Sequence, residues 1–210
     1  MVRVDSAARL KPPVGTMQNN KEAQLISQAR DGDVSSFSAL VEIYQERAVH
    51  VAMSFLGNVE DAKDCAQDAF VKAYFNLKSF KAESQFYTWF CRILINQCKD
   101  FLRKKMVRRA FSFWNNEESD LADLIESKEK NAEEITLSAE LGQTIYTAIS
   151  TLPFQQQSAF TLRYLEGLSL EEISEVMNLN LGTVKAHLWQ AVQKMRKKLS
   201  ALKSEEVENG

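Results

Sequence analysis

Residues 167–199 read GLSLEEISEVMNLNLGTVKAHLWQAVQKMRKKL, and this stretch decides the fold of the C-terminal part of the chain. Ser169 and Glu172 have the spacing of a capping box, in which hydroxyl and carboxylate each accept from a free backbone N–H at a helix start. Apolar residues then recur at helical spacing, at Leu170, Ile173, Val176 and Met177. Residues 178–180, Asn-Leu-Asn, interrupt the apolar spacing. Asparagine tolerates the left-handed conformation that a tight turn requires, so a turn is expected here. A second apolar stripe follows at Leu181, Val184, Leu188, Ala191, Met195 and Leu199. The stretch therefore predicts a helix-turn-helix.

The second of these helices is predicted to show solvent a face suited to DNA. That face carries Gly182, Ala186, Trp189, Gln190, Gln193 and Lys197, flanked by Thr183, Lys185 and Arg196. Small residues at the helix start allow close approach to base edges, and Thr, Lys and Gln contact bases or phosphates. The basic cluster of Lys194, Arg196, Lys197 and Lys198 suits a phosphate backbone. A major-groove reader is predicted, and a helical hairpin with a solvated basic end is the alternative.

Composition favours an all-α protein with long helices. The 210 residues include only 7 Gly and 3 Pro, and no run of alternating β-branched residues appears. The hydrophobic share of 45% with 26% charged residues is that of an ordinary globular chain. A net charge of −2 does not by itself indicate nucleic acid, but the charge is unevenly distributed, and a basic patch matters more than the total.

The cysteines and histidines do not suggest a metal site or an enzyme. Cys65, Cys91 and Cys98 form no CxxC pattern, and His50 and His187 are isolated. An odd cysteine count without a secretion signal fits a reducing cytoplasm, where these residues are structural. We find no nucleophile–base pair and no phosphate loop, so neither catalysis nor a cofactor is expected.

The chain is predicted to hold two helical domains. Residues 1–20 have no apolar core of a signal peptide and are expected to be a flexible leader, in which Met17 offers a second start beside Met1. No window reaches the apolar length of a membrane span. The acidic, weakly apolar stretch within 110–136 is expected to be a linker between domains at 21–109 and 137–203, and 204–210 to be an acidic tail.

Residues 59–77, VEDAKDCAQDAFVKAYFNL, predict a helix that buries Ala62, Ala66, Ala69, Phe70, Ala73 and Leu77. Its opposite face carries Asp61, Asp64 and Asp68, here called the acidic ridge. A solvated face and a docking site for a basic partner both explain this ridge. A metal site is disfavoured because ligands normally converge from more than one element.

Residues 85–105, QFYTWFCRILINQCKDFLRKK, predict a helix with a core stripe of Phe90, Ile93, Leu94 and Phe101. A polar line on the other side is expected to hold Thr88, Arg92, Asn96, Lys99 and Arg103, with Trp89 beside it and Phe86 and Tyr87 before it. Aromatic rings stack on unpaired bases, an amide reads a base edge and cations hold phosphates. The pattern thus suits single-stranded DNA, and a polar face beside core aromatics is the alternative.

Three segments together, DAKDCAQDAFVKAY, SFKAESQFYTWFCRILINQCKDFLRKK and LRYLEGLSLEEISEVMNLNLGTVKAHL, resemble an extracytoplasmic-function (ECF) sigma factor of the sigma-70 family. Two motif blocks stand in the family's order and spacing across an acidic linker, and the match covers about residues 21–203. The resemblance implies a sigma-2 helical bundle and a sigma-4 helix-turn-helix. It also implies core RNA polymerase and promoter DNA as partners, and an anti-sigma factor that the family leads one to expect at the membrane.

The resemblance also assigns residues to roles. Core polymerase is expected to bind Asp61, Asp64, Gln67, Asp68 and Phe70. The melted minus-10 element is expected to contact Tyr87, Thr88, Trp89, Arg92, Asn96, Lys99 and Arg103, with Asn96 at a base-reading position. The minus-35 element is expected to contact Thr183, Lys185, Ala186, His187, Trp189, Gln190 and Lys194. The chain departs from the family at His187, Gln190 and Val192, where arginine is frequent, at Asn180, and at Gln157, which also replaces a frequent arginine.

The sequence therefore predicts a cytoplasmic, non-enzymatic transcription initiation factor that directs RNA polymerase to promoters. One rival is a helix-turn-helix regulator that acts without recruiting core polymerase. That class has no need of the aromatic and basic block at 85–105. A second rival, a helical enzyme with an accessory DNA-binding module, is supported by no residue set.

Overall fold

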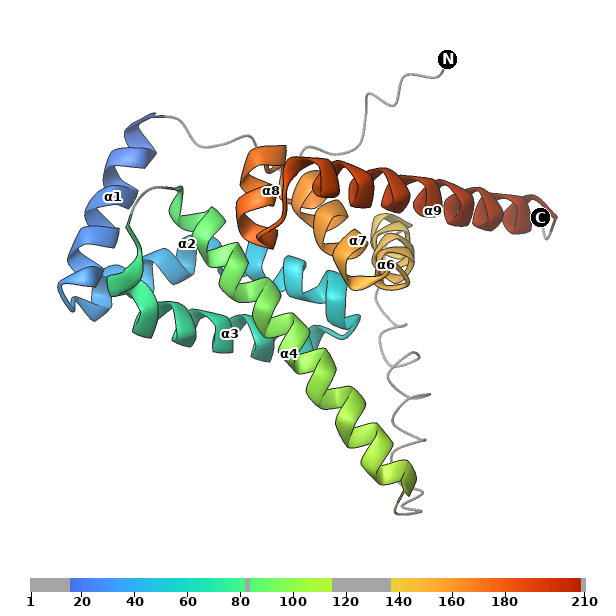
Figure 1. Ribbon diagram of the computed structural model, residues 1–210, viewed down its shortest axis with the longest axis horizontal. Coiled ribbons are helices and arrows are strands. Elements are labelled where there is room, and N and C mark those ends of the chain that lie inside the picture. Colours follow the sequence, from blue (N-terminus) through green and yellow to red (C-terminus); the bar gives the residue numbers. More distant parts are fainter. Residues whose placement is uncertain (1–15, 82–83, 115–136, 209–210) are drawn as a thin grey trace.

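The computed structural model describes residues 16–81, 84–114 and 137–208, which form helices and turns without a strand (Figure 1). This confirms the all-α prediction. The elements are α1 (Thr16–Arg30), α2 (Val34–Leu56), α3 (Val59–Asn76), the short 3-10 turn η1 (Leu77–Ser79), α4 (Phe86–Trp114), α6 (Leu137–Ser150), α7 (Phe154–Phe160), the π-helical turn η2 (Thr161–Leu165), α8 (Leu170–Met177) and α9 (Leu181–Glu208). None of these helices is long and apolar enough to cross a membrane.

Local start and stop signals delimit the N-terminal helices. The Asp33 carboxylate caps α2 by accepting from the backbone N–H groups of Ser35 and Ser36. The hydroxyls of Ser36 and Ser35 also donate to it, and these bonds, with the backbone bonds, lower the pKa of Asp33. Gly57 ends α2 in the left-handed region, at φ 68°, where a side chain would be strained. Asn58 then caps α3, so the two helices are joined by a tight turn.

The core of the N-terminal block lies between α2, α3 and α4. The predicted small-residue face of α3 is confirmed, because Ala62, Ala66, Ala69, Phe70, Ala73 and Leu77 are all buried. Small side chains let α3 approach its neighbours closely. The Phe70 ring stacks on Phe90 of α4, with ring centroids 4.3 Å apart. Helix α1 joins this block through the Tyr44 hydroxyl, which donates to Glu22 Oε1 at 2.7 Å.

The C-terminal block packs directly against the N-terminal one. A small core of its own unites Ala148, Ile149, Leu152, Ala191 and Met195. Leu162, Leu168, Ile173, Val176 and Val184, however, belong to the same apolar cluster as the residues of α2, α3 and α4. Helix α8 lies beside α4, and α6 and η2 contact α2 (Figure 1). The two predicted helical domains thus share the larger core, and the C-terminal block keeps a second, smaller one.

Several helices extend beyond the bounds that the sequence predicted. Residues 16–20 of the predicted leader are already part of α1, and residues 110–114 of the predicted linker continue α4. Helix α9 likewise runs through most of the predicted tail. No glycine or proline interrupts these stretches, so each helix continues from its packed part. The remaining leader and linker residues lie outside the described ranges.

Candidate nucleic-acid interface

One face of α4 presents the predicted polar row to solvent. Arg92, Asn96, Lys99 and Arg103 are all exposed, while Phe90, Leu94 and Cys98 on the other side are fully buried. A helix that repeats every 3.6 residues brings this row into one line. Arg103 pairs with Asp100 of its own helix, at 3.5 Å, and its side chain is 75% exposed, so its charge lies on the surface. The row can therefore meet a polyanion without rearrangement.

Thr88, predicted within this row, and Tyr87, predicted just before it, are covered instead. Tyr87 is 4% exposed and Thr88 is 2% exposed, so the prediction that Thr88 lies on the solvent face needs correction. The cause is α8, which packs on this end of α4 and which a helical wheel cannot show. Trp89 is half-buried and packs against Phe80 and Phe86, with ring centroids 5.3 and 5.6 Å away.

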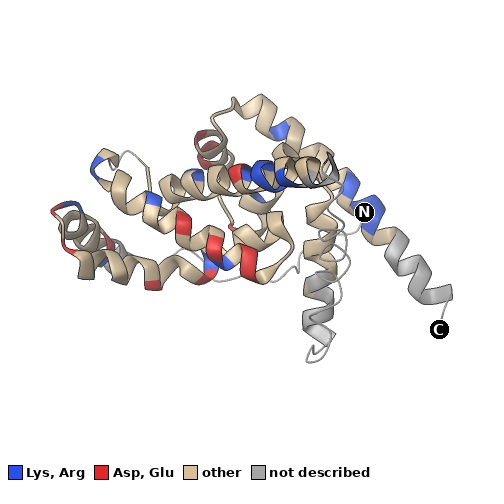
Figure 2. Cartoon of the chain, turned by 90° about the horizontal axis from the view of Figure 1, so that it is seen from below, with Lys and Arg blue, Asp and Glu red and all other residues tan. Residues whose placement is uncertain are grey.

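The acidic ridge lies on α3, and α4 engages two of its three carboxylates. Asp61 Oδ2 pairs with Lys105 Nζ at 2.8 Å, and Asp68 Oδ2 accepts from Gln97 Nε2 at 3.0 Å. Asp64 and Gln67 are exposed. Figure 2 shows acidic residues recurring along α3 and basic residues gathering in the second half of α4. The ridge therefore offers less free charge than the sequence indicated.

The prediction that Phe70 contacts a partner also needs correction. Its ring is 6% exposed and stacks on Phe90, so it holds α3 on α4 rather than forming a surface. Gln97, which was not predicted as a contact residue, is buried and accepts from Lys72 while donating to Asp68. Its amide spans the α3–α4 contact, where burial requires that polar groups be paired.

The helix-turn-helix has the predicted local structure. Ser169 and Glu172 form the capping box, with the Ser169 N–H donating to Glu172 Oε2 at 2.8 Å and the Glu172 N–H to Ser169 Oγ at 3.1 Å. Asn178 adopts the left-handed conformation at φ 52°. Asn180 Oδ1 accepts from both the backbone N–H and the hydroxyl of Thr183, which lies in the first turn of α9. This bond fixes the Thr183 side chain at the helix entrance.

The outer face of α9 is exposed, as predicted. Lys185, Ala186, Gln190 and Lys194 lie on the surface, Trp189 is 65% exposed, and Thr183 and His187 are half-buried. Gln190 Oε1 accepts from Gln156 Nε2 at 2.7 Å, and Gln190 is exposed, so its amide nitrogen can donate to a bound partner. Beside Trp189 runs a groove of about 380 Å³, lined by Tyr164, Leu170, Lys185, Leu188, Trp189, Val192, Gln193 and Arg196.

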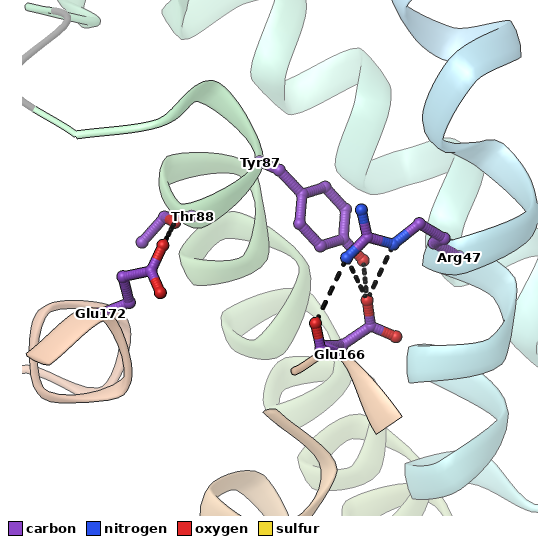
Figure 3. A network of polar contacts seen from close by, with 5 residues as sticks. All are labelled: Arg47, Tyr87, Thr88, Glu166 and Glu172. Atoms are coloured by element: carbon purple, nitrogen blue, oxygen red, sulfur yellow. Dashed lines mark hydrogen bonds and ion pairs between the residues drawn. The ribbon is translucent and has the colours of Figure 1, made fainter. Parts of the chain in front are cut away.

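A polar network that the sequence analysis did not predict joins the two blocks (Figure 3). Glu166 Oε2 accepts from the Tyr87 hydroxyl at 2.7 Å and pairs with Arg47 Nη2 at 2.9 Å and Nε at 3.1 Å. The Arg47 guanidinium also lies 3.8 Å from the centroid of the Tyr87 ring. The Thr88 hydroxyl donates to Glu172 Oε1 at 3.2 Å.

Electrostatics within this network reinforce the pairing. Burial raises the pKa of the Tyr87 hydroxyl well above its ordinary value, and Glu166 adds to this, so the phenol remains a donor. Burial alone would lower the pKa of Arg47, but Tyr87 and Glu166 raise it overall. The Glu166 side chain is 4% exposed, and a buried carboxylate needs such partners.

A second pair of contacts between the blocks involves Gln157, one of the departures from the family named above. The Gln157 amide nitrogen donates to the backbone carbonyl of Ser54, and the Ser54 hydroxyl lies 3.0 Å from Thr161 Oγ1. Gln157 is 3% exposed, and its amide forms a hydrogen bond with α2. A charged arginine would need a counter-ion at this buried position.

In the part of the chain that the structure describes, no group of three or more His, Cys, Asp and Glu side chains could hold a metal ion. Cys65 and Cys98 lie in contact across α3 and α4, with their sulfurs 3.5 Å apart, and Cys91 is buried separately. Cys65 and Cys98 are 33 positions apart in the sequence, so spacing gave no sign of this contact.

Two family models match the chain, sigma-70 region 2 over residues 40–125 and sigma-70 region 4 over residues 142–195. Among curated proteins, the chain is 34% identical over 179 residues to the ECF RNA polymerase sigma factor SigW of Bacillus subtilis, covering 84% of this chain and 96% of that one. It is 36% identical over 183 residues to the ECF RNA polymerase sigma-E factor of Escherichia coli K12, covering 85% and 94%.

Solved structures show the same fold at lower identity. CnrH in complex with the cytosolic domain of CnrY matches with a TM-score of 0.63 and 22% identity, over 86% of this chain and 98% of that one. The sigma factor RpoE of Bartonella quintana, in complex with the anti-sigma factor NepR, matches with a TM-score of 0.59 and 20% identity, over 80% and 98%. With both regions matched and relatives above 30% identity over most of its length, the chain belongs to the extracytoplasmic-function sigma factors of the sigma-70 family.

Proposed function

We propose that this sigma factor binds core RNA polymerase, directs it to promoters and takes part in opening them. The observation that carries the proposal is the presence of two separate exposed polar faces, one on α4 and one on α9. The α4 face combines cations with an amide, and the α9 face belongs to a helix-turn-helix. One face suits an unpaired strand and the other a major groove, which together suit a promoter rather than a simple operator.

Each face has a distinct role in this proposal. Asn96 reads an unpaired minus-10 base, Arg92, Lys99 and Arg103 hold phosphates, and Trp89 borders the site; Tyr87 and Thr88 join them once uncovered. The minus-35 duplex meets α9 at Thr183, Lys185, Ala186, His187, Trp189, Gln190 and Lys194. Core polymerase docks on α3 at Asp61, Asp64, Gln67 and Asp68, where opposite charge steers association.

The proposed partners follow from the same family. Relatives are named RNA polymerase sigma factors, and one similar structure is titled as a complex of the sigma factor RpoE with the anti-sigma factor NepR. We therefore infer that an anti-sigma factor controls this protein and that it works in the cytoplasm, beside the polymerase. The polymerase supplies the chemistry of RNA synthesis, so the chain itself needs no catalytic residues.

The direct test is run-off transcription with purified core polymerase on genomic DNA fragments. We expect discrete transcripts from the chain and core together, and none from either alone. The double variant Arg92→Ala/Asn96→Ala should still bind core polymerase, but a matched reaction with it should yield none of those transcripts. Specific duplex binding without polymerase, and no transcripts with it, would instead identify a helix-turn-helix regulator.

A further inference from the structure

The surface of α2 and α4 that Glu166 and Glu172 cover is built to receive an anion. It presents a guanidinium at Arg47 and two hydroxyl donors at Tyr87 and Thr88, which all point toward the C-terminal block (Figure 3). A carboxylate takes these donors in the same way as a phosphate oxygen, because both are anions that accept charge-assisted bonds. Each acidic side chain thus stands where a phosphate of a nucleic acid strand could lie.

This covered surface adjoins the exposed polar row of α4. Thr88 lies one turn before Arg92 on α4 and continues the exposed row of Arg92, Asn96, Lys99 and Arg103. The neighbouring Tyr87 lies between Thr88 and Arg47 of α2 (Figure 3), with its ring 3.8 Å from the Arg47 guanidinium. A strand that follows the row toward the start of α4 would meet Thr88, Tyr87 and then Arg47. In the structure, residues 166–172 close that path.

Resting on the proposed function, we propose that Arg47, Tyr87 and Thr88 form a phosphate-binding extension of the minus-10 site, which Glu166 and Glu172 mask in the closed arrangement. The C-terminal block and the promoter strand then compete for the same donors. Arg47 becomes a DNA-binding residue, and Glu166 becomes the residue that keeps free sigma factor from engaging single-stranded DNA.

Glu166 is the better of the two acidic residues to change. Glu172 also belongs to the capping box of α8, so its loss would disturb the helix start as well as the contact with Thr88. Glu166 holds Arg47 and Tyr87 together through one buried oxygen. Glu171 is a matched control, because it carries the same charge nearby but is exposed.

The first arm measures closure in the full chain without polymerase. Spin labels are attached at Lys78→Cys and Lys197→Cys, both exposed positions, and pulsed electron paramagnetic resonance measures the distance between the two blocks. The three native cysteines are buried, so the label reacts with the introduced ones. We expect one narrow distance distribution for the parent and for Glu171→Ala, and a broad, longer one for Glu166→Ala. The swapped pair Arg47→Glu/Glu166→Lys should restore the narrow distribution, which separates loss of the ion pair from misfolding. Equal distributions in parent and Glu166→Ala would overturn the masking.

The second arm measures binding to an oligo-dT strand across salt concentrations. We expect Glu166→Ala to bind more tightly than Glu171→Ala, with a salt dependence steeper by about 0.7 for each phosphate newly engaged. Adding Arg47→Ala should remove that gain, and a methylphosphonate strand without backbone charge should not show it. Equal binding by Glu166→Ala and Glu171→Ala would overturn the phosphate site. Neither arm uses core polymerase, so a failure here is distinct from a failure of run-off transcription.

Discussion

Lys105 Nζ of α4 lies 2.8 Å from Asp61 Oδ2 of α3, so one end of the acidic ridge is neutralised within the protein itself. The other end is also engaged, since Asp68 accepts from the buried amide of Gln97. Asp64, between them, is exposed. A partner that docks on the ridge through charge would therefore depend most on Asp64.

We predict that Asp64→Lys weakens binding to core RNA polymerase by about three- to tenfold. A single exposed ion pair contributes up to about 1 kcal/mol, and a reversal replaces attraction with repulsion. A fluorescence titration of labelled sigma factor with core polymerase measures the change. Asp31→Lys, an equally exposed reversal in the turn after α1, is the control. If the two variants bind alike, the ridge is an ordinary solvated face.

The exposed row on α4 leads to a prediction about promoter opening. Asn96→Ala should retain binding to core polymerase but open promoters poorly, because the lost amide both donates to and accepts from a base edge. One well-placed base contact is worth about 1–3 kcal/mol of discrimination. Permanganate reactivity of unpaired thymines measures opening, and a template mismatched through the minus-10 region should partly restore it. Opening of duplex DNA at the parent level would make Asn96 a solvated residue only.

The capping box gives a prediction about stability. Ser169→Ala removes the acceptor of the Glu172 N–H and should lower the free energy of unfolding by about 1 kcal/mol. Urea unfolding followed by circular dichroism measures this. Ser38→Ala is a suitable control, since Ser38 is exposed and its hydroxyl donates to the Val34 carbonyl of the same helix rather than capping a helix start. A loss no greater than that of the control would mean that packing alone fixes the start of α8.

The sequence predicted what depends on neighbours along the chain. Helical spacing located the buried alanines of α3, and the pairing of Ser169 with Glu172 located the start of α8. It also placed Asn96 correctly on an exposed face. In each case the residues that decide the structure lie within a few turns of one another.

What the sequence could not predict depends on contacts between the blocks. A helical wheel groups Thr88 with Arg92, yet Glu172 of α8, 84 positions away, accepts from the Thr88 hydroxyl and covers it. Glu166 follows the segment TLRYL and has no pattern that marks it as the partner of Arg47. Such pairs appear only once packing has brought distant surfaces together.

The thiols should be unreactive in the folded protein. Cys65, Cys91 and Cys98 are fully buried, and burial raises the pKa of Cys91 far above its usual range. The bond to Cys65, together with burial, likewise raises the pKa of Cys98. Since the thiolate is the reactive form, Ellman's reagent at neutral pH should modify none of the three before unfolding and all three in denaturant. Rapid native labelling of one thiol would show local opening around α4.

The outer face of α9 offers a phosphate contact at Lys185 and a base contact at Gln190, and the two should respond differently to mutation. Lys185 is a flexible cation beside the groove at Trp189, which suits a phosphate. Gln190 is held on one side by Gln156 and keeps its amide nitrogen for a base.

Lys185→Ala should weaken binding to all minus-35 sequences alike and reduce the salt slope by about 1. Gln190→Ala should instead cost about 1–3 kcal/mol at one base pair and leave the slope unchanged. Holoenzyme binding to promoters with a permuted minus-35 element, repeated at several salt concentrations, distinguishes the two, with the exposed Lys78→Ala of the N-terminal block as control. Should both α9 variants match that control, the minus-35 duplex does not lie against this face of α9.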